Sequence, residues 1–158
     1  MRFKGARRLE NLVVVQSDQY EGAFYVTPFL IQMLRIEATG AAEILDLLFE
    51  IANGFAEAAD LVAYSLLERP FAHCVPNEQG LVEPLAIACR GAVLRGFSCF
   101  LARLQSADTK VKENALELLR SFVEFRALMD ASLTDALEIE PDAAFRTKIE
   151  NVRDEFRR

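Results

Sequence analysis

Histidine, cysteine and tryptophan are scarce in this sequence, which limits the chemistry that the chain can perform. Its 158 residues contain one histidine, three cysteines and no tryptophan. The cysteines, Cys74, Cys89 and Cys99, are odd in number and form no C-x-x-C pair, which argues against a disulfide framework or a zinc site. Because Cys89 and Cys99 fall within apolar helical patterns, we expect them to be small buried hydrophobic residues.

The one arrangement that suggests a reactive thiol is the pair His73-Cys74. Adjacent side chains seldom point at each other, and no asparagine or aspartate stands beside the pair to orient the histidine. The sequence also lacks a glycine-rich phosphate loop, a G-x-S-x-G motif and an H-E-x-x-H motif. We therefore expect a protein that is not an enzyme and has no catalytic residue, cofactor or metal. A small hydrolase that uses His73 and Cys74 is a third hypothesis, after the two given below.

Glycine and proline are also few, 7 and 5 residues, in a chain that is 52% hydrophobic. Such a composition favours a folded chain over a disordered one. No apolar run approaches the ~18 residues that a membrane-spanning helix needs, and the run behind the basic residues 1–8 is too short for a secretory signal. We therefore expect a cytoplasmic protein that does not bind membranes.

Two helices joined by a short polar turn are indicated by residues 97–123. Phe97, Phe100, Leu101 and Leu104 have the i, i+3, i+4, i+7 spacing of one helix face. Asp108 is suited to cap the second helix, because its carboxylate can accept hydrogen bonds from free backbone amides. The apolar stripe of that helix consists of Val111, Ala115, Leu118, Leu119, Phe122 and Val123. The polar residues left for water or a partner are Lys112, Glu113, Glu117, Arg120 and Glu124.

Residues 28–51 repeat this unit. A shift of 70 places Leu34 on Leu104 and Ile31 on Leu101. A shift of 71 beyond the turn places Asp46 on Glu117. The apolar positions that coincide under the second shift are Ile44 with Ala115, Leu45 with Leu116, Leu47 with Leu118, Leu48 with Leu119, and Ile51 with Phe122. A repeat of about 35 residues, or twice that, is typical of stacked helical hairpins, in which each pair rests on the next.

A family resemblance follows from these motifs. The run D-x-x-V-K-x-x-A-x-x-x-L, residues 108–119, resembles the second helix of a HEAT repeat. Together with Thr27-Pro28 opening one helix, Asn53-Gly54 closing the next, and the segment ACRGAV at 88–93, it resembles a group of small bacterial HEAT-like proteins. The likeness covers residues 20–125. Many such proteins serve as immunity partners of secreted toxins, and this is the role that the resemblance implies.

The fold that we expect is all-α: one domain over 1–158, built of about seven or eight helices in stacked antiparallel hairpins, a HEAT/armadillo-like solenoid. The expected helices are 3–15, 24–35, 39–53, 56–68, 81–94, 97–104, 109–129 and 141–158. Pro28 and Pro84 should lie in first turns, and Asn53-Gly54 should form a left-handed C-cap.

Three further segments complete this prediction. Residues 69–80 should form an irregular loop. In an acidic linker, residues 130–142, Leu133, Ala136 and Leu137 should form one short helix. Residues 142–158 should cap the stack through a stripe of Phe145, Ile149, Val152 and Phe156.

Charge is unevenly distributed along the chain. The net charge is −6, yet residues 9–68 hold ten acids and a single base, Arg35. An acidic surface repels nucleic acid and attracts basic proteins. We expect the binding surface for a basic protein to consist of Glu43, Asp46, Glu50, Glu113, Glu117 and Glu124, on the second helices of the two repeats. The alternative is that these are ordinary solvent-facing helix residues.

Two functions remain open at this point. The first is an immunity protein that binds and neutralises a basic toxin domain through this acidic surface. The alternative is a HEAT-like scaffold or regulatory adaptor that binds a helix or peptide of a cellular complex. In the second case, the 69–80 loop could supply an apolar anchor through Phe71 and Val75.

Overall fold

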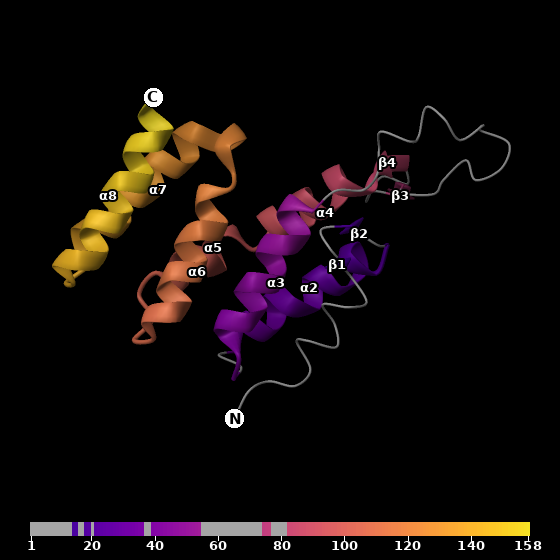
Figure 1. Ribbon diagram of the computed structural model, residues 1–158, viewed down its shortest axis with the longest axis horizontal. Coiled ribbons are helices and arrows are strands. Elements are labelled where there is room, and N and C mark those ends of the chain that lie inside the picture. Colours follow the sequence, from indigo (N-terminus) through magenta and orange to yellow (C-terminus); the bar gives the residue numbers. More distant parts are fainter. Residues whose placement is uncertain (1–13, 16–17, 20, 37–38, 55–73, 77–81) are drawn as a thin grey trace, which may run out of the picture. The chain divides into compact units, whose positions relative to one another are not determined.

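The computed structural model describes residues 14–15, 18–19, 21–36, 39–54, 74–76 and 82–158. The helix predicted at 56–68, and residues 3–13 of the first predicted helix, lie outside them. Most of the described residues are helical: they form seven α-helices, one 3-10 turn and two short β-hairpins (Figure 1). This confirms the predicted all-α character. Within these residues no single helix is long and apolar enough to cross a membrane. One consecutive pair, α4 (Leu85–Leu94) with α5 (Phe97–Arg103), has the length and composition needed only when both helices are counted together, and it is bent by 54°.

The chain divides into two compact units, Met1–Gly96 and Phe97–Arg158, which we call the N-terminal and C-terminal units and describe separately. The N-terminal unit contains α2 (Glu21–Arg35), α3 (Ala41–Asn53) and α4 (Leu85–Leu94). Each of these helices packs against the other two. The largest fully buried side chains of these three helices are Leu30, Leu34, Ile44, Leu45, Leu48, Ile51 and Leu85. The prediction of a single domain over 1–158 stays a prediction.

The structure contains two β-hairpins that the sequence analysis did not predict. β1 (Val14–Val15) pairs with β2 (Asp18–Gln19), and β3 (Cys74–Pro76) pairs with β4 (Val82–Pro84), both antiparallel. Val14 and Val15 were expected in a helix, but β-branched side chains also suit a strand. The second hairpin opposes Val75 to Glu83, so part of the predicted 69–80 loop is regular. Pro84 is the residue before α4 rather than part of its first turn.

Helix α2 begins at Glu21, earlier than predicted, and so contains Pro28 in its interior. Proline has no backbone N–H and cannot complete the helical hydrogen bond to the carbonyl four residues before it. The neighbouring Thr27 is fully buried, and its Oγ1 donates to the Ala23 carbonyl at 2.7 Å. This hydrogen bond keeps the buried hydroxyl satisfied in the turn that holds the proline.

The left-handed C-cap predicted for α3 at Asn53-Gly54 is not present. Gly40, before the helix, has φ 96° and is the one left-handed glycine among the described residues, whereas Gly54, after it, is extended at φ −66°, ψ 158°. The left-handed glycine therefore starts the helix instead of ending it. At the C-terminal end, Asn53 Nδ2 donates to the Phe49 carbonyl at 2.8 Å.

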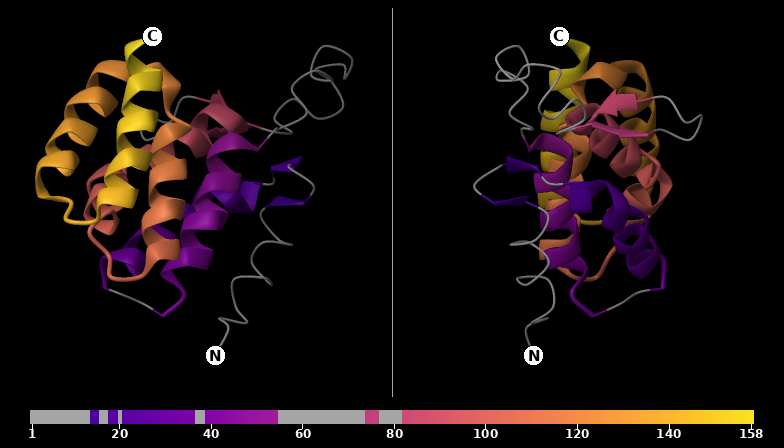
Figure 2. Two further views of the ribbon diagram at one scale, coloured as in Figure 1. Left: turned by 60° about the vertical axis from the view of Figure 1, so that its left-hand side comes forward. Right: turned by 90° about the vertical axis from the view of Figure 1, so that its right-hand side faces the viewer.

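The C-terminal unit contains α5 (Phe97–Arg103), α6 (Thr109–Arg120), the 3-10 turn η2 (Val123–Phe125), α7 (Arg126–Ile139) and α8 (Ala143–Arg157). α5 packs against α6, and α8 packs against both α7 and α6; Figure 2 shows the α7–α8 pair side by side. The predicted stripe of the last helix is confirmed, because Phe145, Ile149, Val152 and Phe156 are all buried.

Helix α6 ends at Arg120, short of the predicted run to residue 129. Phe122 stays fully buried but leaves helical geometry at φ −89°, ψ 58°. The chain turns there, so Val123 is exposed instead of belonging to the apolar stripe. The predicted acidic linker is the 14-residue helix α7. Helix α7 forms because Met129, Leu133, Ala136 and Leu137 have helical spacing, and all four are buried.

The internal repeat reappears in the burial pattern. Every apolar residue of α3 that coincides with one of α6 under the 71-residue shift is buried, and so is its counterpart. Asp46 and Glu117 are both exposed, and each lies between two pairs of buried residues. Leu34 and Leu104, which coincide under the shift of 70, are both fully buried. Ile31 is buried, but its counterpart Leu101 is only half-buried. The two helix pairs, α2–α3 and α5–α6, therefore bury most, but not all, of the equivalent positions of the repeated unit.

Candidate functional site

The solvent-facing strip of α3 is acidic. Seven of its thirteen residues are apolar and buried, and its only exposed residues are Asp46 and Glu50. Glu43, half-buried, lies one turn before Asp46 in the first turn of the helix, where a carboxylate complements the helix dipole. Neither Glu43 nor Glu50 has an ion-pair partner within the described part of the chain. We call Glu43, Asp46 and Glu50 the α3 acidic strip.

Arg90 of α4 holds the C-terminal end of the helix that carries this strip. Its Nη1 donates to the Ala52 carbonyl at 3.0 Å and to Asn53 Oδ1 at 3.2 Å. The last turn of α3 contains no base of its own, so Arg90 supplies the positive charge that stabilises a helix C-terminus. Sequence reasoning placed Arg90 only in the ACRGAV motif, and only the packing of α4 against α3 reveals this role.

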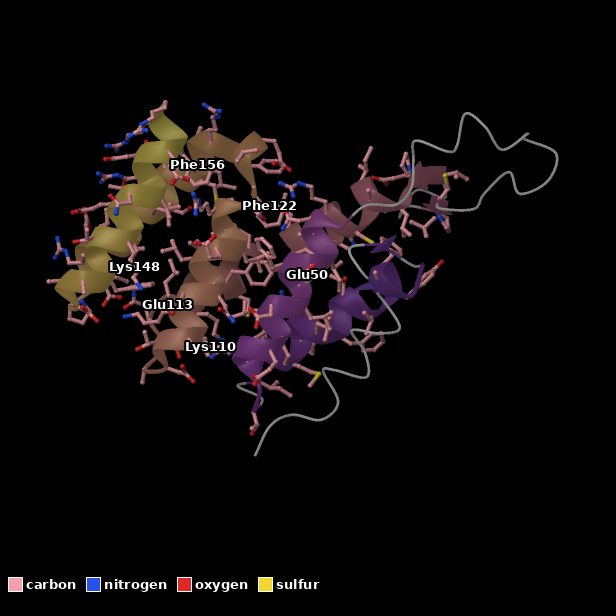
Figure 3. The ribbon with its side chains drawn as sticks, viewed as in Figure 1. Glu50, Lys110, Glu113, Phe122, Lys148 and Phe156 are labelled. Atoms are coloured by element: carbon pink, nitrogen blue, oxygen red, sulfur yellow. The ribbon has the colours of Figure 1, made fainter. Side chains whose placement is uncertain are left out.

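Two of the predicted acids of the C-terminal unit, Glu113 and Glu117, have ion-pair partners inside that unit. Glu113 of α6 forms an ion pair with Lys148 of α8, and the two lie together between their helices in Figure 3. Arg120 lies 2.7 Å from Glu155 and 3.4 Å from Glu117. The pKa of Arg120 is raised, first by its hydrogen bond to Glu155. On α6, therefore, both signs of charge alternate, in contrast to α3.

Lys112, predicted to face water or a partner, is instead part of the interior. Its Nζ donates to Glu140 Oε1 at 2.8 Å and lies 2.7 Å from Oε2, and the Glu140 side chain is completely buried. The same Oε1 accepts from the Asp142 amide at 2.9 Å. Lys112 Nζ also lies 4.5 Å from the centre of the Phe145 ring, close enough for a cation–π contact. This cluster joins α6 to the turn between α7 and α8.

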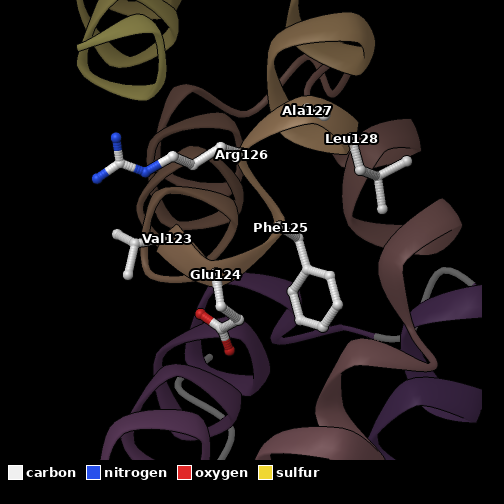
Figure 4. A pocket seen from close by; sticks show the side chains of 6 residues that line it. All are labelled: Val123, Glu124, Phe125, Arg126, Ala127 and Leu128. Carbon is white, nitrogen blue, oxygen red and sulfur yellow. The ribbon is translucent and has the colours of Figure 1, made fainter.

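An apolar hollow lies where η2 meets α7. It has a volume of about 510 Å³ and is lined by Val123, Glu124, Phe125, Arg126, Ala127 and Leu128 (Figure 4). Val123, Phe125 and Leu128 are 58%, 38% and 45% exposed. Glu124, which the sequence assigned to the acidic surface, is thus an exposed residue of a largely apolar corner. Sequence analysis missed this corner because it extended the α6 helix through it.

The cysteines behave as the composition indicated. Cys89 and Cys99 are buried, which confirms that prediction, and burial raises the pKa of the Cys89 thiol to about 12. Cys74 is half-buried in β3, whereas His73 and Phe71 lie outside the described residues. Val75, the other apolar anchor proposed for the loop, is buried and so offers no exposed surface. Across the described ranges, no group of three or more metal-ligating side chains is arranged to hold a metal ion.

Comparison with known proteins gives no further information on this site. No family model, no curated protein and no solved structure matches the chain.

Proposed function

We propose that this protein is a non-catalytic protein-binding module, an immunity protein that binds and neutralises a basic bacterial toxin domain. The observation that carries the proposal is the α3 acidic strip, because both exposed residues of that helix are acids. The resemblance of residues 20–125 to small bacterial HEAT-like proteins supports the role. The excess of acidic over basic residues within 9–68 supports a positively charged partner.

The helical spacing supports recognition of a basic surface. Glu43, Asp46 and Glu50 follow one another at i, i+3 and i+7, so they span about 10 Å along the helix. A nuclease presents Lys and Arg side chains to the phosphates of its substrate, and carboxylates can occupy the positions of those phosphates. Like charges three or four residues apart destabilise a helix by about 0.2–0.5 kcal/mol per pair. A binding role would explain why the chain retains this arrangement.

The proposed architecture is a HEAT-like solenoid of stacked hairpins. Its support is the repeated burial of equivalent residues in α2–α3 and α5–α6, together with the HEAT-like run at residues 108–119. In such a stack the second helix of each pair contributes to a common binding face.

Reversal of the α3 charges tests the function directly. The variant Glu43→Lys/Asp46→Lys/Glu50→Lys should lose at least about 100-fold in affinity for a toxin encoded by the neighbouring gene, since each desolvated interfacial carboxylate contributes about 2 kcal/mol or more. It should also fail to protect cells. The matched control reverses three exposed acids of the C-terminal unit, Asp135, Glu138 and Glu150, and should bind normally. Unchanged affinity in the α3 variant at unchanged stability would refute the proposal.

The adaptor function has one observation in its favour, the apolar hollow between η2 and α7. Exposed Val123, Phe125 and Leu128 could receive the apolar face of a helix or peptide from a cellular complex. The double substitution Phe125→Ser/Leu128→Ser separates the two functions. An adaptor should lose its peptide ligand and an immunity protein should keep its toxin.

A further inference from the structure

The outward face of α2 presents two aromatic rings to solvent. Tyr25 and Phe29 lie one turn apart on this face and are 54% and 70% exposed. The second value is the largest for any large apolar side chain among the described residues. The Tyr25 ring packs edge-to-face against the Phe24 ring, with the two ring centres 5.3 Å apart. One exposed ring is therefore held in position by its neighbour, and the other projects freely beside it.

Beside these rings, a backbone carbonyl lacks its usual helical donor. The carbonyl of Phe24 points along the helix toward residue 28, and Pro28 has no N–H to donate to it. Pro28 is itself exposed and directly precedes Phe29, so this acceptor lies on the aromatic side of the helix. The Thr27 hydroxyl in the same turn donates instead to the Ala23 carbonyl, at 2.7 Å. A partner that covers this face must supply a donor, because an acceptor that is buried without one is unfavourable.

Three features together define the chemistry of that partner. The faces of aromatic rings attract cations, the carbonyl requires an N–H donor, and the excess of acids within residues 9–68 attracts positive charge. A guanidinium group meets all three conditions, because it is cationic, stacks flat on a ring and carries several N–H groups. A lysine ammonium is compact and strongly hydrated, so it stacks less well. An apolar side chain would cover the carbonyl without supplying a donor.

We infer that this face of α2, centred on Tyr25 and Phe29, binds an arginine side chain of a basic protein. The only base of α2, Arg35, is in the last turn of the helix, six residues and about 9 Å beyond Phe29. It therefore leaves the first half of the helix open to a cation. The inference rests on the proposed function for the identity of the protein that carries the arginine. Its residues are separate from the α3 acidic strip.

NMR titration of the full chain with N-acetyl-arginine amide tests the inference, because this probe carries the side-chain charge alone. The ring signals of Tyr25 and Phe29 should shift, with a Kd on the order of 10 mM. N-acetyl-lysine amide should bind at least about threefold more weakly, and N-acetyl-leucine amide should cause no shift. Phe29→Leu keeps an apolar side chain but removes the ring, so it should weaken binding of the arginine probe at least about threefold. The matched control, Ile36→Ser, removes a side chain that is as exposed as Phe29 and should leave this binding unchanged.

Ring shifts that are specific to the arginine probe and that weaken in Phe29→Leu support the inference. Absence of shifts, or equal shifts with the leucine probe, overturns it.

Toxin affinity separates this inference from the proposed function. Phe29→Leu should weaken toxin binding at least about tenfold, since a cation–π contact is stronger when desolvated, and Ile36→Ser should not. If Phe29→Leu binds the toxin normally while the α3 charge reversal abolishes binding, the inference is wrong and the proposed function stands. If the arginine probe binds as expected but the wild-type chain binds no toxin, the arginine site stands and the proposed function is wrong.

Discussion

Arg90 of α4 donates to the backbone carbonyl of Ala52 at 3.0 Å, joining the middle of one helix to the C-terminal end of another. The final carbonyls of a helix have no partners within it. Satisfying one of them with a charged donor stabilises α3 and fixes its position against α4. The acidic strip is thereby carried on a helix that is held at its C-terminal end and buried along its apolar face.

Replacement of Arg90 by methionine, which keeps the apolar stem, should lower the free energy of unfolding by about 1–2 kcal/mol, because α3 loses both a charge-assisted hydrogen bond and a dipole interaction. Urea unfolding measures the change. Arg90→Lys should lose less, since the charge remains. Equal stability of the methionine variant and the wild type would show that the contact contributes nothing.

The buried pair Lys112–Glu140 should be sensitive to the removal of one partner. Glu140→Gln keeps an acceptor for the Asp142 amide but leaves the Lys112 charge, 12% exposed, without its counter-charge. We expect a loss of about 2–4 kcal/mol in chemical denaturation. The exposed neighbour Glu138→Gln serves as control and should stay within about 0.5 kcal/mol.

The double variant Lys112→Met/Glu140→Leu extends this test. Because no unpaired charge is left in the interior, its loss should be smaller than that of Glu140→Gln alone. The single variants Lys112→Met and Glu140→Leu complete the cycle. If the double variant loses the sum of their two losses, the pair is not coupled and the interpretation is wrong.

The N-caps of α6 and α8 provide a second test of what stabilises the C-terminal unit. Asp108 Oδ1 accepts from the Lys110 amide at 2.8 Å, and Asp142 Oδ1 accepts from the Ala144 amide at the same distance. Alanine at either position should cost about 1 kcal/mol, whereas asparagine, which can still cap, should cost much less. Thermal unfolding of the four variants checks this. An asparagine variant as unstable as the alanine one would indicate that capping is not the cause.

Thiol labelling probes burial in each unit. At pH 8 the buried Cys89, with a pKa raised to about 12, should be a thiolate in only about one molecule in 10⁴. Iodoacetamide should therefore modify the half-buried Cys74 first, and Cys89 and Cys99 only in denaturant. The stabilising effect of the neutral Cys89 thiol is complete below the ordinary thiol pKa and declines as the pH rises toward 12. Rapid labelling of Cys89 in the native protein would contradict its burial.

Periodicity predicted the elements with regular apolar spacing. The stripe at Phe145, Ile149, Val152 and Phe156, the cap at Asp108 and the burial shared by the two repeats are all present. Each depends on the spacing of residues a few positions apart in the sequence, which the helical period turns into one face or one cap.

The features that the sequence did not predict depend on contacts between distant residues. Lys112 looked like a surface residue until its partner, 28 positions away, placed it in the interior. Likewise, the chain leaves helical geometry at Phe122, which stays buried, and Val123 is then exposed at the corner. For the candidate site, spacing gave the α3 strip, but the partners of Glu113 and Glu117 within their own unit could not be read from it.

The salt dependence of toxin association tests the central claim, that the α3 acidic strip captures a basic partner. Stopped-flow mixing of the wild-type chain with the toxin should give an association rate constant that falls about tenfold or more between ~0.02 and ~0.5 M NaCl, as screening weakens attraction between exposed charges. The Glu43→Lys/Asp46→Lys/Glu50→Lys variant should associate slowly at low salt and lose this decline. A wild-type rate constant independent of salt, or an equal salt dependence in the variant, would contradict the account.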